Sequence, residues 1–421
     1  MKNYYCVGIL YISTVLGCIM TLTFIGGVRP DSRTTASKKK IEYYADCTSV
    51  CYPVSENSDC ELFAEPGERV YAGQQIAKID GLPVYSSVSG EFRGYTVIAD
   101  ERFLVVISDG QKEYRSPLMP ESRRLTDIPR EEIIELARSL GITDSRSGKP
   151  LYALMSEVKN CMRIVVDCTE SDPLSAIAYR LCVEKAESIV GGSKVLMYAL
   201  GAEKGVFAAE YYRKMVFSAL REQVSDDSLF AFAELDEKYP YTDRTLMDAL
   251  YVRNMPSDAT PADEGVLIVG PEAVCALYDG LLTGMPHITR YVSVCGKVEN
   301  EKNLCVPSGI TVHDIMSVCG RSGGSIIAEN SLLSGRTARG YVSAEVRALI
   351  CTDRAEKKIL PCIGCGACSD ACTMRLTPKA ILGADRKTHE YLRTRCTACG
   401  CCEYICPCGI PLMTKILREV K

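Results

Sequence analysis

Two stretches of sequence decide the fold of the C-terminal part of this chain: CIGCGACSDAC at residues 362–372 and CTACGCCEYIC at residues 396–406. Each places four cysteines in the order C-x2-C-x2-C-x3-C, and Pro407 follows the second stretch. With two residues between cysteines, one short loop can wrap three thiols around a centre, so the fourth thiol at that centre must come from elsewhere. The two stretches are therefore expected to form one unit.

This repeated spacing is typical of domains that bind two [4Fe–4S] clusters, each of which needs four thiolates and carries one electron. In such domains the fourth cysteine of each run ligates the other cluster. Glycines within the runs fit this interpretation, because loops that wrap a cluster need backbone freedom. The predicted ligand sets are Cys362, Cys365, Cys368 and Cys406 for one cluster, and Cys396, Cys399, Cys402 and Cys372 for the other.

Zinc sites and disulfides are the alternatives for so many cysteines. Structural zinc usually uses two C-x2-C knuckles with a longer spacer, and disulfides do not favour such dense spacing in one loop. One departure from the iron–sulfur pattern is Thr373, which stands where a proline usually follows the fourth cysteine. Cys401 and Cys408 lie beside predicted ligands, and we interpret them as spectators.

Composition bounds the rest of the chain. The 421 residues are enough for two to four domains, and a net charge of −4 without a long basic run argues against nucleic acid as a partner. Of 23 cysteines, those outside the two runs scatter without regular spacing, as small hydrophobic residues do in a reducing compartment. The three histidines have no partner at ligand spacing, so we interpret them as structural or surface residues.

The N-terminal stretch from residue 4 to residue 28 carries no charge and is long enough to span a bilayer. As a membrane anchor, with the basic residues after it, it would hold the body on the cytoplasmic side. As a signal peptide, it would be cleaved near Cys18, and as an upstream extension it would precede a true start at Met20. Export fits poorly with free thiols and cluster assembly.

Residues 61–110 alternate short apolar strands with turns at glycines, which predicts a small β barrel-sandwich. Biotinyl and lipoyl carriers share this pattern, but they modify a lysine at a hairpin tip. Lys78 instead lies inside a strand pattern and lacks a flanking methionine, so we favour a structural role for this part.

Residues 128–265 alternate between helix and strand, which predicts an α/β layer domain. A smaller unit of strands and one helix begins at residue 290, and a loop-rich stretch follows at residues 322–337. Predicted helices are 131–140, 175–200 with a break at Gly191-Gly192, 211–222, 242–250 and 312–319, and predicted strands are 163–167, 205–209, 229–233 and 290–296.

Along nearly its whole length the chain resembles the C subunit of the Rnf complex, the ion-translocating ferredoxin:NAD oxidoreductase. The residues that carry the resemblance are TFIGGVRP at 23–30, SSVSG at 86–90 and the second cysteine run with its trailing Ile410-Pro411-Leu412. The order of modules is also similar, and it is shared by proline-reductase-associated electron transfer proteins. Cobalamin reductases place the barrel-sandwich last.

The resemblance implies an α+β multidomain protein with FMN and NADH chemistry, membrane partners and a redox partner such as ferredoxin. It implies a peripheral position on the cytoplasmic side of the membrane. The implied parts are a hydrophobic leader or upstream extension (1–22), a β barrel-sandwich hybrid (23–115), an α/β domain like the NADH-binding subunit of complex I (120–265), a soluble-ligand-binding β-grasp unit (266–330), a linker (331–357) and a two-cluster, ferredoxin-like α-helical domain (358–421).

The family's flavin site is only partly present. Its glycine-rich phosphate loop corresponds to residues 141–150, where two glycines remain and Asp144 is expected to repel a phosphate. The next segment, DCTESDP at 167–173, resembles a family motif and implies that Glu170 and Asp172 lie beside the flavin or nicotinamide. The alternative is a solvated turn at a strand end, capped by Asp172.

Two functions stay open at this point. The chain is either an Rnf-type C subunit that passes electrons between ferredoxin and NAD(H), or an electron carrier or scaffold without flavin or NADH. Flavin converts a two-electron hydride into single electrons, so loss of flavin would leave only a one-electron relay. A third interpretation is a ferredoxin anchored to the membrane through residues 4–28.

Overall fold

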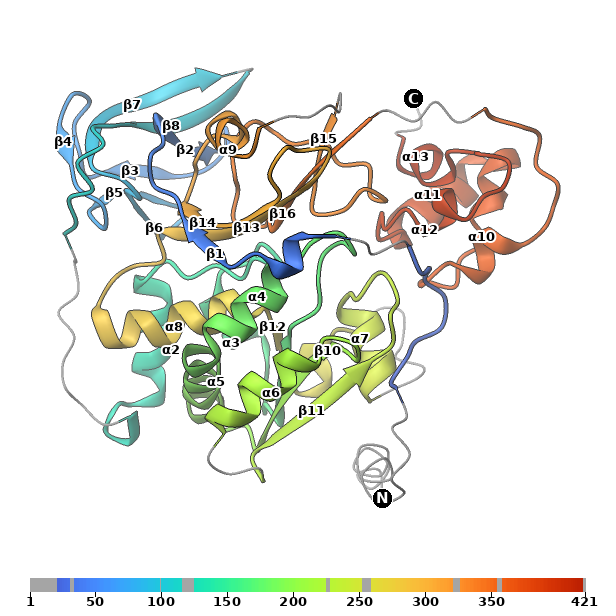
Figure 1. The fold of residues 1–421 in the computed structure, drawn as a ribbon, viewed down its shortest axis with the longest axis horizontal. Coiled ribbons are helices and arrows are strands. Elements are labelled where there is room, and N and C mark those ends of the chain that lie inside the picture. The colour runs from blue at the N-terminus through green and yellow to red at the C-terminus, as the bar shows by residue number, and fades with distance from the viewer. Residues whose placement is uncertain are drawn as a thin grey trace.

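The computed structural model describes residues 21–30, 34–98, 100–115, 125–224, 228–251, 259–320, 326–353 and 358–418. Most of the charge-free stretch at residues 4–28 lies outside them, so its three interpretations stay predictions. Within the described ranges, no helix is both long and apolar enough to cross a membrane. The strands β2–β8 and the sheet around β13 lie above an α/β part, and a small helical part lies to one side (Figure 1).

The N-terminal strands form two antiparallel sheets, in the orders β2-β8-β7-β4 and β3-β5-β6. Their inward side chains, such as Ile76, Phe92 and Leu104, are fully buried. Lys78 lies within β5, paired with Glu61 and Pro83, and not at a hairpin tip. The strands are β2 (Ser49–Val54), β3 (Cys60–Leu62), β4 (Arg69–Val70), β5 (Gln75–Ile79), β6 (Leu82–Tyr85), β7 (Gly90–Ile98) and β8 (Glu101–Ser108).

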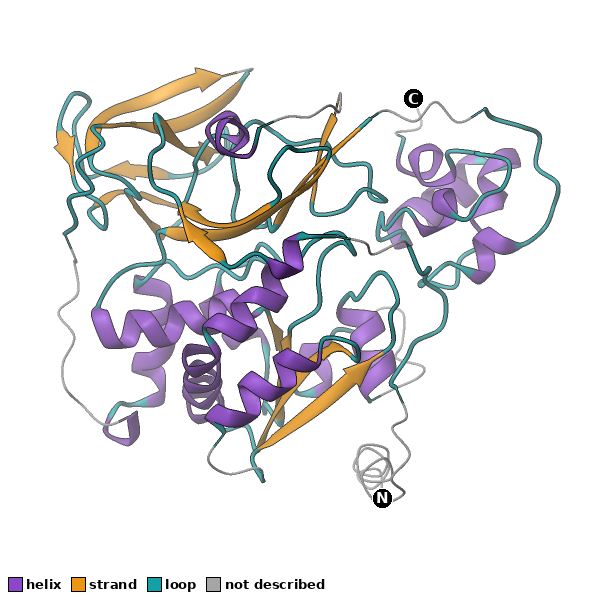
Figure 2. Cartoon of the chain, in the orientation of Figure 1, coloured by secondary structure: helices purple, strands orange, loops and turns teal. Residues whose placement is uncertain are grey.

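The α/β part contains a parallel sheet in the order β11-β10-β9-β12, covered by helices (Figure 2). Its strands are apolar on both faces: Ile164 packs in one hydrophobic core and Val165 in the other. The elements are α2 (Arg130–Ser139), α3 (Leu151–Glu157), β9 (Arg163–Asp167), α4 (Ile177–Glu184), α5 (Ala186–Leu200), β10 (Lys204–Glu210), α6 (Lys214–Gln223), β11 (Phe230–Leu235), α7 (Asp243–Leu250), β12 (Val266–Val269) and α8 (Pro271–Thr283).

The predicted helix at residues 175–200 is interrupted, but not at its two glycines. The interruption falls at Lys185, between α4 and α5. Gly191 and Gly192 lie inside α5, where α8 crosses so closely that a Cβ on Gly192 would lie 2.1 Å from the carbonyl oxygen of Val274. The glycines therefore permit close helix packing and do not break the helix.

A fourth, five-stranded sheet has the order β1-β14-β13-β16-β15 and shares one hydrophobic core with the barrel-sandwich. Its three central strands include both parallel and antiparallel pairs. The elements are β1 (Ile41–Tyr43), β13 (Thr289–Gly296), β14 (Lys302–Pro307), α9 (Val312–Cys319), β15 (Ile326–Glu329) and β16 (Ala348–Thr352).

The sheets correct the domain boundaries expected from sequence. The boundary at 265/266 is wrong, because β12 pairs with β9 in the α/β sheet and α8 packs on α5. Conversely, β1 from the expected barrel-sandwich range pairs with β14, and β16 from the expected linker pairs with β13. The expected loop at 322–337 contains β15. Each of these strands is short, and its partner lies far away in the sequence.

The C-terminal part is a small helical domain with its own core around Leu392, Met413 and Ile416. A strand-like segment at residues 21–30 joins it to the α/β part: Val28 exchanges backbone hydrogen bonds with Tyr239, and the N–H of Gly27 donates to Ala371. The helices are α10 (Ala367–Asp370), α11 (Arg386–Arg395), α12 (Cys401–Tyr404) and α13 (Leu412–Leu417), with a 3-10 turn at Pro378–Gly383.

Candidate cluster sites and the adjoining cleft

The eight cysteines of the two runs surround two cavities in the C-terminal domain. The grouping is the crossed one expected from the spacing, although ligation itself stays a prediction. Among the described residues no three His, Cys, Asp or Glu side chains converge as the ligands of one metal ion do; the cysteines instead surround a space, as a polynuclear cluster requires. The outer cavity is lined by Cys362, Cys365, Cys368 and Cys406, and the inner cavity by Cys372, Cys396, Cys399 and Cys402; Cys408 also lines the outer cavity and Cys401 the inner one.

The two runs build their cavities with the same local geometry. Gly366 and Gly400 each adopt a left-handed conformation, with φ of 82° and 78°, immediately before a one-turn helix. That helix carries the third cysteine of each run, Cys368 or Cys402, in a buried position. Only glycine adopts this φ without strain, which explains why a glycine follows the second cysteine in both runs.

The inner cavity favours a thiolate at Cys399. Interaction with the Cys401 thiol, helped by the backbone N–H of Cys401 and the hydroxyls of Thr397 and Thr373, lowers the pKa of Cys399 to about 6 despite its burial. Thr373 thus places a polar group at the inner cavity where the usual proline has none. Cys401 is fully buried, and its sulfur also lies 3.6 Å from the carbonyl oxygen of Tyr239, an alternative acceptor for its single S–H.

The two cavities face different surroundings. At the outer cavity Cys362 and Cys365 are exposed, and Ile363 between them is 70% exposed. The inner cavity borders a cleft of about 720 Å³ between the C-terminal domain and the α/β part, and Thr397 and Cys399 line both. One cysteine set therefore faces solvent and the other faces the cleft.

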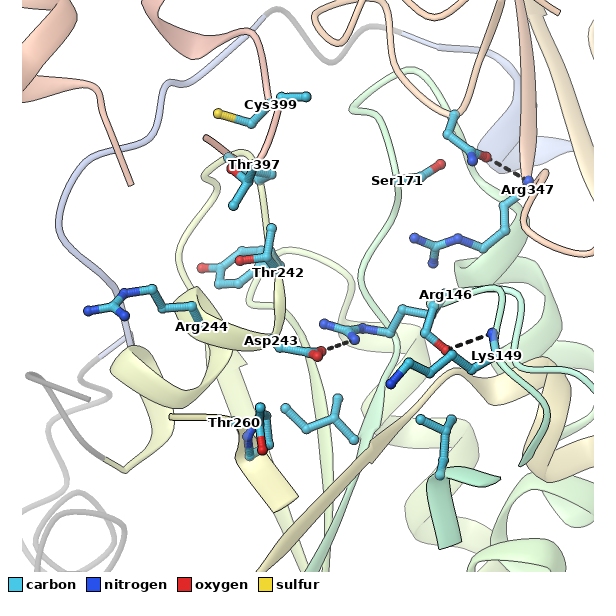
Figure 3. A pocket seen from close by; sticks show the side chains of 18 of the residues that line it. Arg146, Lys149, Ser171, Thr242, Asp243, Arg244, Thr260, Arg347, Thr397 and Cys399 are labelled. Atoms are coloured by element: carbon cyan, nitrogen blue, oxygen red, sulfur yellow. Dashed lines mark hydrogen bonds and ion pairs between the residues drawn. The ribbon is translucent and has the colours of Figure 1, made fainter. Parts of the chain in front are cut away.

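The cleft has polar and cationic walls (Figure 3). Arg146 and Lys149 come from the loop before α3, Arg347 from the segment before β16, and Thr242 from the N-cap of α7. Lys149 is paired with Glu157, and the Arg347 guanidinium reaches the carbonyl oxygen of Thr169 at 3.5 Å. Figure 3 shows Cys399 and Thr397 at one end of the cleft and Thr260 at the other.

Glu170 and Asp172 lie close together near the cleft, but both carboxylates already accept hydrogen bonds from backbone N–H groups. Glu170 lines the cleft and accepts hydrogen bonds from the N–H of Tyr179 at 2.8 Å and the hydroxyl of Ser175 at 2.9 Å, at the start of α4. Asp172 accepts from the N–H groups of Leu174 and Leu332. Their positions beside a flavin or nicotinamide stay predictions.

The alternative of a solvated turn is wrong in one respect. Glu170 is 9% exposed and Asp172 is 2% exposed, so the turn is buried. Burial raises the pKa of Asp172 above its usual value, against the lowering effect of the two N–H groups. The carboxylates do cap backbone groups, as that alternative expected.

Glu210, the last residue of β10, is a buried acid that sequence reasoning missed. Burial raises its pKa to about 7, and the charge of Glu170 adds to this, although Arg213 opposes it. Its Oε2 atom accepts no hydrogen bond within the described structure, and Arg213 Nε lies 3.6 Å away. The sequence signal that could have identified it is an acidic residue directly after the apolar run VFAA, at the predicted end of a buried strand.

The loop at residues 141–150 differs from expectation. Asp144 is fully buried and turned inward, where its Oδ1 accepts the N–H of Gly270 at 2.8 Å and its Oδ2 accepts the N–H of Ser147 at 3.0 Å. It therefore does not face the cleft to repel a ligand, as the sequence suggested. It thus occupies the N–H groups of Gly270 and Ser147, which are the kind of donor that a phosphate uses.

Comparisons with known proteins agree with this architecture. The family model described as the RnfC barrel sandwich hybrid domain matches residues 22–100, and the one described as the Nuo51 FMN-binding domain matches residues 146–279. The second range includes β12 and most of α8, in agreement with the sheet pairing. An NAD+-reducing [NiFe]-hydrogenase in its air-oxidized state has a similar fold, with a TM-score of 0.50 at 12% identity over 65% of this chain and 60% of that one.

Relatives extend along most of the chain. The C subunit of the Na(+)-translocating ferredoxin:NAD(+) oxidoreductase complex of Acetobacterium woodii is 25% identical, covering 85% of this chain and 86% of the relative. Its proton-translocating counterpart from Clostridium ljungdahlii is 26% identical, covering 86% and 85%. The C subunit of the ion-translocating oxidoreductase complex of Pasteurella multocida is 26% identical, but this chain spans 51% of its length. The chain is thus a relative of the C subunits of the ion-translocating ferredoxin:NAD(+) oxidoreductase complexes, which confirms the resemblance seen in its motifs.

Proposed function

We propose that this chain transfers electrons through two [4Fe–4S] clusters as an Rnf-type C subunit. The observation that carries the proposal is the arrangement of eight cysteines around two cavities, each completed by a cysteine from the other run. When bound, such a cluster accepts and releases one electron at a time. The names of the relatives support a place in a ferredoxin:NAD(+) oxidoreductase complex.

The residues around the cavities define two ends of the proposed relay. The outer set, with Cys362 and Cys365 exposed, is open to a partner protein. The inner set is closed to bulk solvent on the side of Cys401 and borders the cleft through Cys399. Electrons would therefore be exchanged with one partner at the outer surface and with another at the cleft.

The partners we propose are the other subunits of an Rnf-type membrane complex and a one-electron carrier such as ferredoxin. Association with these subunits would hold the chain at the cytoplasmic side of the membrane. The names of the relatives, which are subunits of ion-translocating complexes, support the association with other subunits.

Separate substitution of one cysteine in each set tests the cluster assignment. In anaerobically reconstituted full-length chain, Cys365→Ser should remove or distort the outer cluster and Cys399→Ser the inner one, as measured by iron content and electron paramagnetic resonance. Cys401→Ala is the matched control, because Cys401 lies beside the inner set without belonging to the predicted ligands, and it should retain both signals. Unchanged iron in both serine variants would refute the assignment.

A second candidate function is an electron carrier or scaffold that binds neither flavin nor NADH. The specific observation in its favour is the inward position of Asp144, which uses the donors of the phosphate loop. Both candidates need the clusters, so the cysteine variants do not separate them, whereas flavin binding does.

A further inference from the structure

The α/β sheet has one place where ligands of open parallel sheets usually bind. The chain runs from β9 through β10 to β11 in one direction and then crosses back to place β12 on the other side of β9. The crevice beyond the carboxyl ends of β9 and β12 is therefore the topological switch point of the sheet. It is bounded by Asp167, which ends β9, and by Gly270, which follows β12.

A loop of the chain lies over the β12 end of this crevice, and Arg146 and Ser147 of that loop also line the cleft described above. A Cβ on Gly270 would lie 3.0 Å from Oδ1 of Asp144 and 3.5 Å from Cβ of Arg146, so both residues sit directly over the glycine. The N–H of Gly270 and the N–H and hydroxyl of Ser147 all donate to Asp144. These are the kinds of donor that a nucleotide phosphate uses at the start of a helix.

Arg146 ties the same loop to the strand ends. Its Nε donates to Oδ2 of Asp167 at 2.5 Å, and its Nη1 donates to Asp243 in the first turn of α7. The Arg146 side chain is 7% exposed. Burial alone would lower the pKa of Arg146, but the charges of Asp243 and Asp167 raise it above its usual value. A phosphate entering the crevice would have to displace Arg146 from its ion pairs, and it would then face the carboxylates of Asp167 and Asp243.

We propose that the loop at residues 144–148 is a built-in occupant of the ligand crevice, with the Asp144 carboxylate in the place of a nucleotide phosphate. FMN is then excluded from the switch point, and NADH has no flavin there to receive its hydride. The consequence for electron entry rests on the cluster function proposed above: the donor at the inner cavity is a one-electron carrier.

Flavin binding by the reconstituted full-length chain gives the first test. FMN fluorescence should show no saturable quenching, and NADH, with or without added FMN, should not bleach the visible absorbance of the clusters, whereas dithionite should. Saturable binding of one FMN per chain would overturn the proposal. Absence of clusters would instead refute the proposed function, because iron content is measured independently of flavin.

Substitution of Asp144 gives the second test, with inorganic phosphate as the probe. Asp144→Ala removes the internal anion and should bind phosphate at least about tenfold more tightly than the unmodified chain. Asp144→Asn keeps an acceptor in the crevice and serves as the matched control, with no gain expected. A folded Asp144→Ala chain that gains no phosphate affinity would show that the carboxylate does not occupy an anion site.

The midpoint of thermal unfolding, measured in phosphate and in chloride at equal ionic strength, tests phosphate binding even if Asp144→Ala is less stable than the unmodified chain. Phosphate stabilises folded proteins in general, and specific binding adds to this by mass action, so the midpoint of Asp144→Ala should rise by more than those of the other two proteins. An equal rise in all three proteins would contradict the proposal. If Asp144→Ala does not fold, the FMN titration of the unmodified chain decides.

Discussion

Glu210 shows how a single residue near the cleft links stability to protons. It is buried at the carboxyl end of β10, and Arg213 compensates its charge incompletely at 3.6 Å. Burial raises its pKa from 4.5 to about 7. The folded chain therefore holds this proton through a pH range in which the unfolded chain releases it.

We predict that Glu210→Gln changes the pH dependence of stability. Because the folded pKa is raised, the contribution of Glu210 is fully present below about pH 4.5 and is lost as the pH rises to about 7. At pH 8 the variant should be more stable than the unmodified chain, by about 3 kcal/mol at most, and at pH 4.5 the two should be alike. Urea unfolding at both pH values measures this difference.

Glu203→Gln, at an exposed position immediately before β10, is the control and should show no such pH dependence. Equal free energies of unfolding for Glu210→Gln and the unmodified chain at pH 8 would rule out a strained carboxylate.

At the scale of elements, the crossing of α5 and α8 explains why Gly191 and Gly192 lie inside a helix, where the sequence predicted a break. A Cβ on Gly191 would meet the ring of Tyr278 at 2.4 Å, and one on Gly192 would meet the backbone of Val274 at 2.1 Å. A tyrosine ring can turn aside, whereas the backbone of a packed helix cannot. The two neighbouring glycines therefore differ in what they tolerate.

We predict that Gly192→Ala is the more damaging of the two alanine substitutions. Both gain helix propensity of up to about 1 kcal/mol. At Gly191 this gain offsets movement of the ring, whereas Gly192→Ala must separate α5 from α8 and should lose about 2 kcal/mol. Chemical denaturation of the pair checks the order, and a larger loss for Gly191→Ala would contradict the packing described.

The pairing of strands also separates what the sequence could predict from what it could not. The spacing within each cysteine run predicts three members of each set locally, and the general pattern of two-cluster domains predicts that the fourth comes from the other run. In contrast, β12 and β16 join their sheets through partners far away in the chain, and no local pattern assigns them. The inward turn of Asp144 depends on Gly270, 126 residues later. Local reasoning recognised the acid but misjudged the direction in which it points.

At the scale of the whole molecule, the segment at residues 21–30 holds the C-terminal domain against the α/β part. Leu22 pairs with the edge of β11, Val28 pairs with Tyr239, and Gly27 reaches Ala371. A Cβ on Gly26 would lie 2.8 Å from the carbonyl oxygen of Cys372, so the contact with the inner cysteine set is close. The inner cavity owes its position beside the cleft partly to this segment.

We predict that removal of residues 1–30 loosens the C-terminal domain, whereas removal of residues 1–21 does not. Loss of the backbone hydrogen bonds to Tyr239 and Ala371 should speed hydrogen exchange in β11 and around Cys372, as measured by mass spectrometry. The shorter truncation keeps those bonds and is the control. Identical exchange in both truncations would show that the segment does not hold the domains together.

The proposal that electrons pass through two clusters is tested most directly by an anaerobic reductive titration of the reconstituted chain. The titration is followed by electron paramagnetic resonance and by iron and sulfide analysis. If the crossed cysteine sets hold two [4Fe–4S] clusters, the chain should contain about eight iron atoms, take up about two electrons and show two reduced-cluster signals. Uptake of one electron or none by a chain with its full complement of iron would contradict the proposal that electrons pass through two clusters.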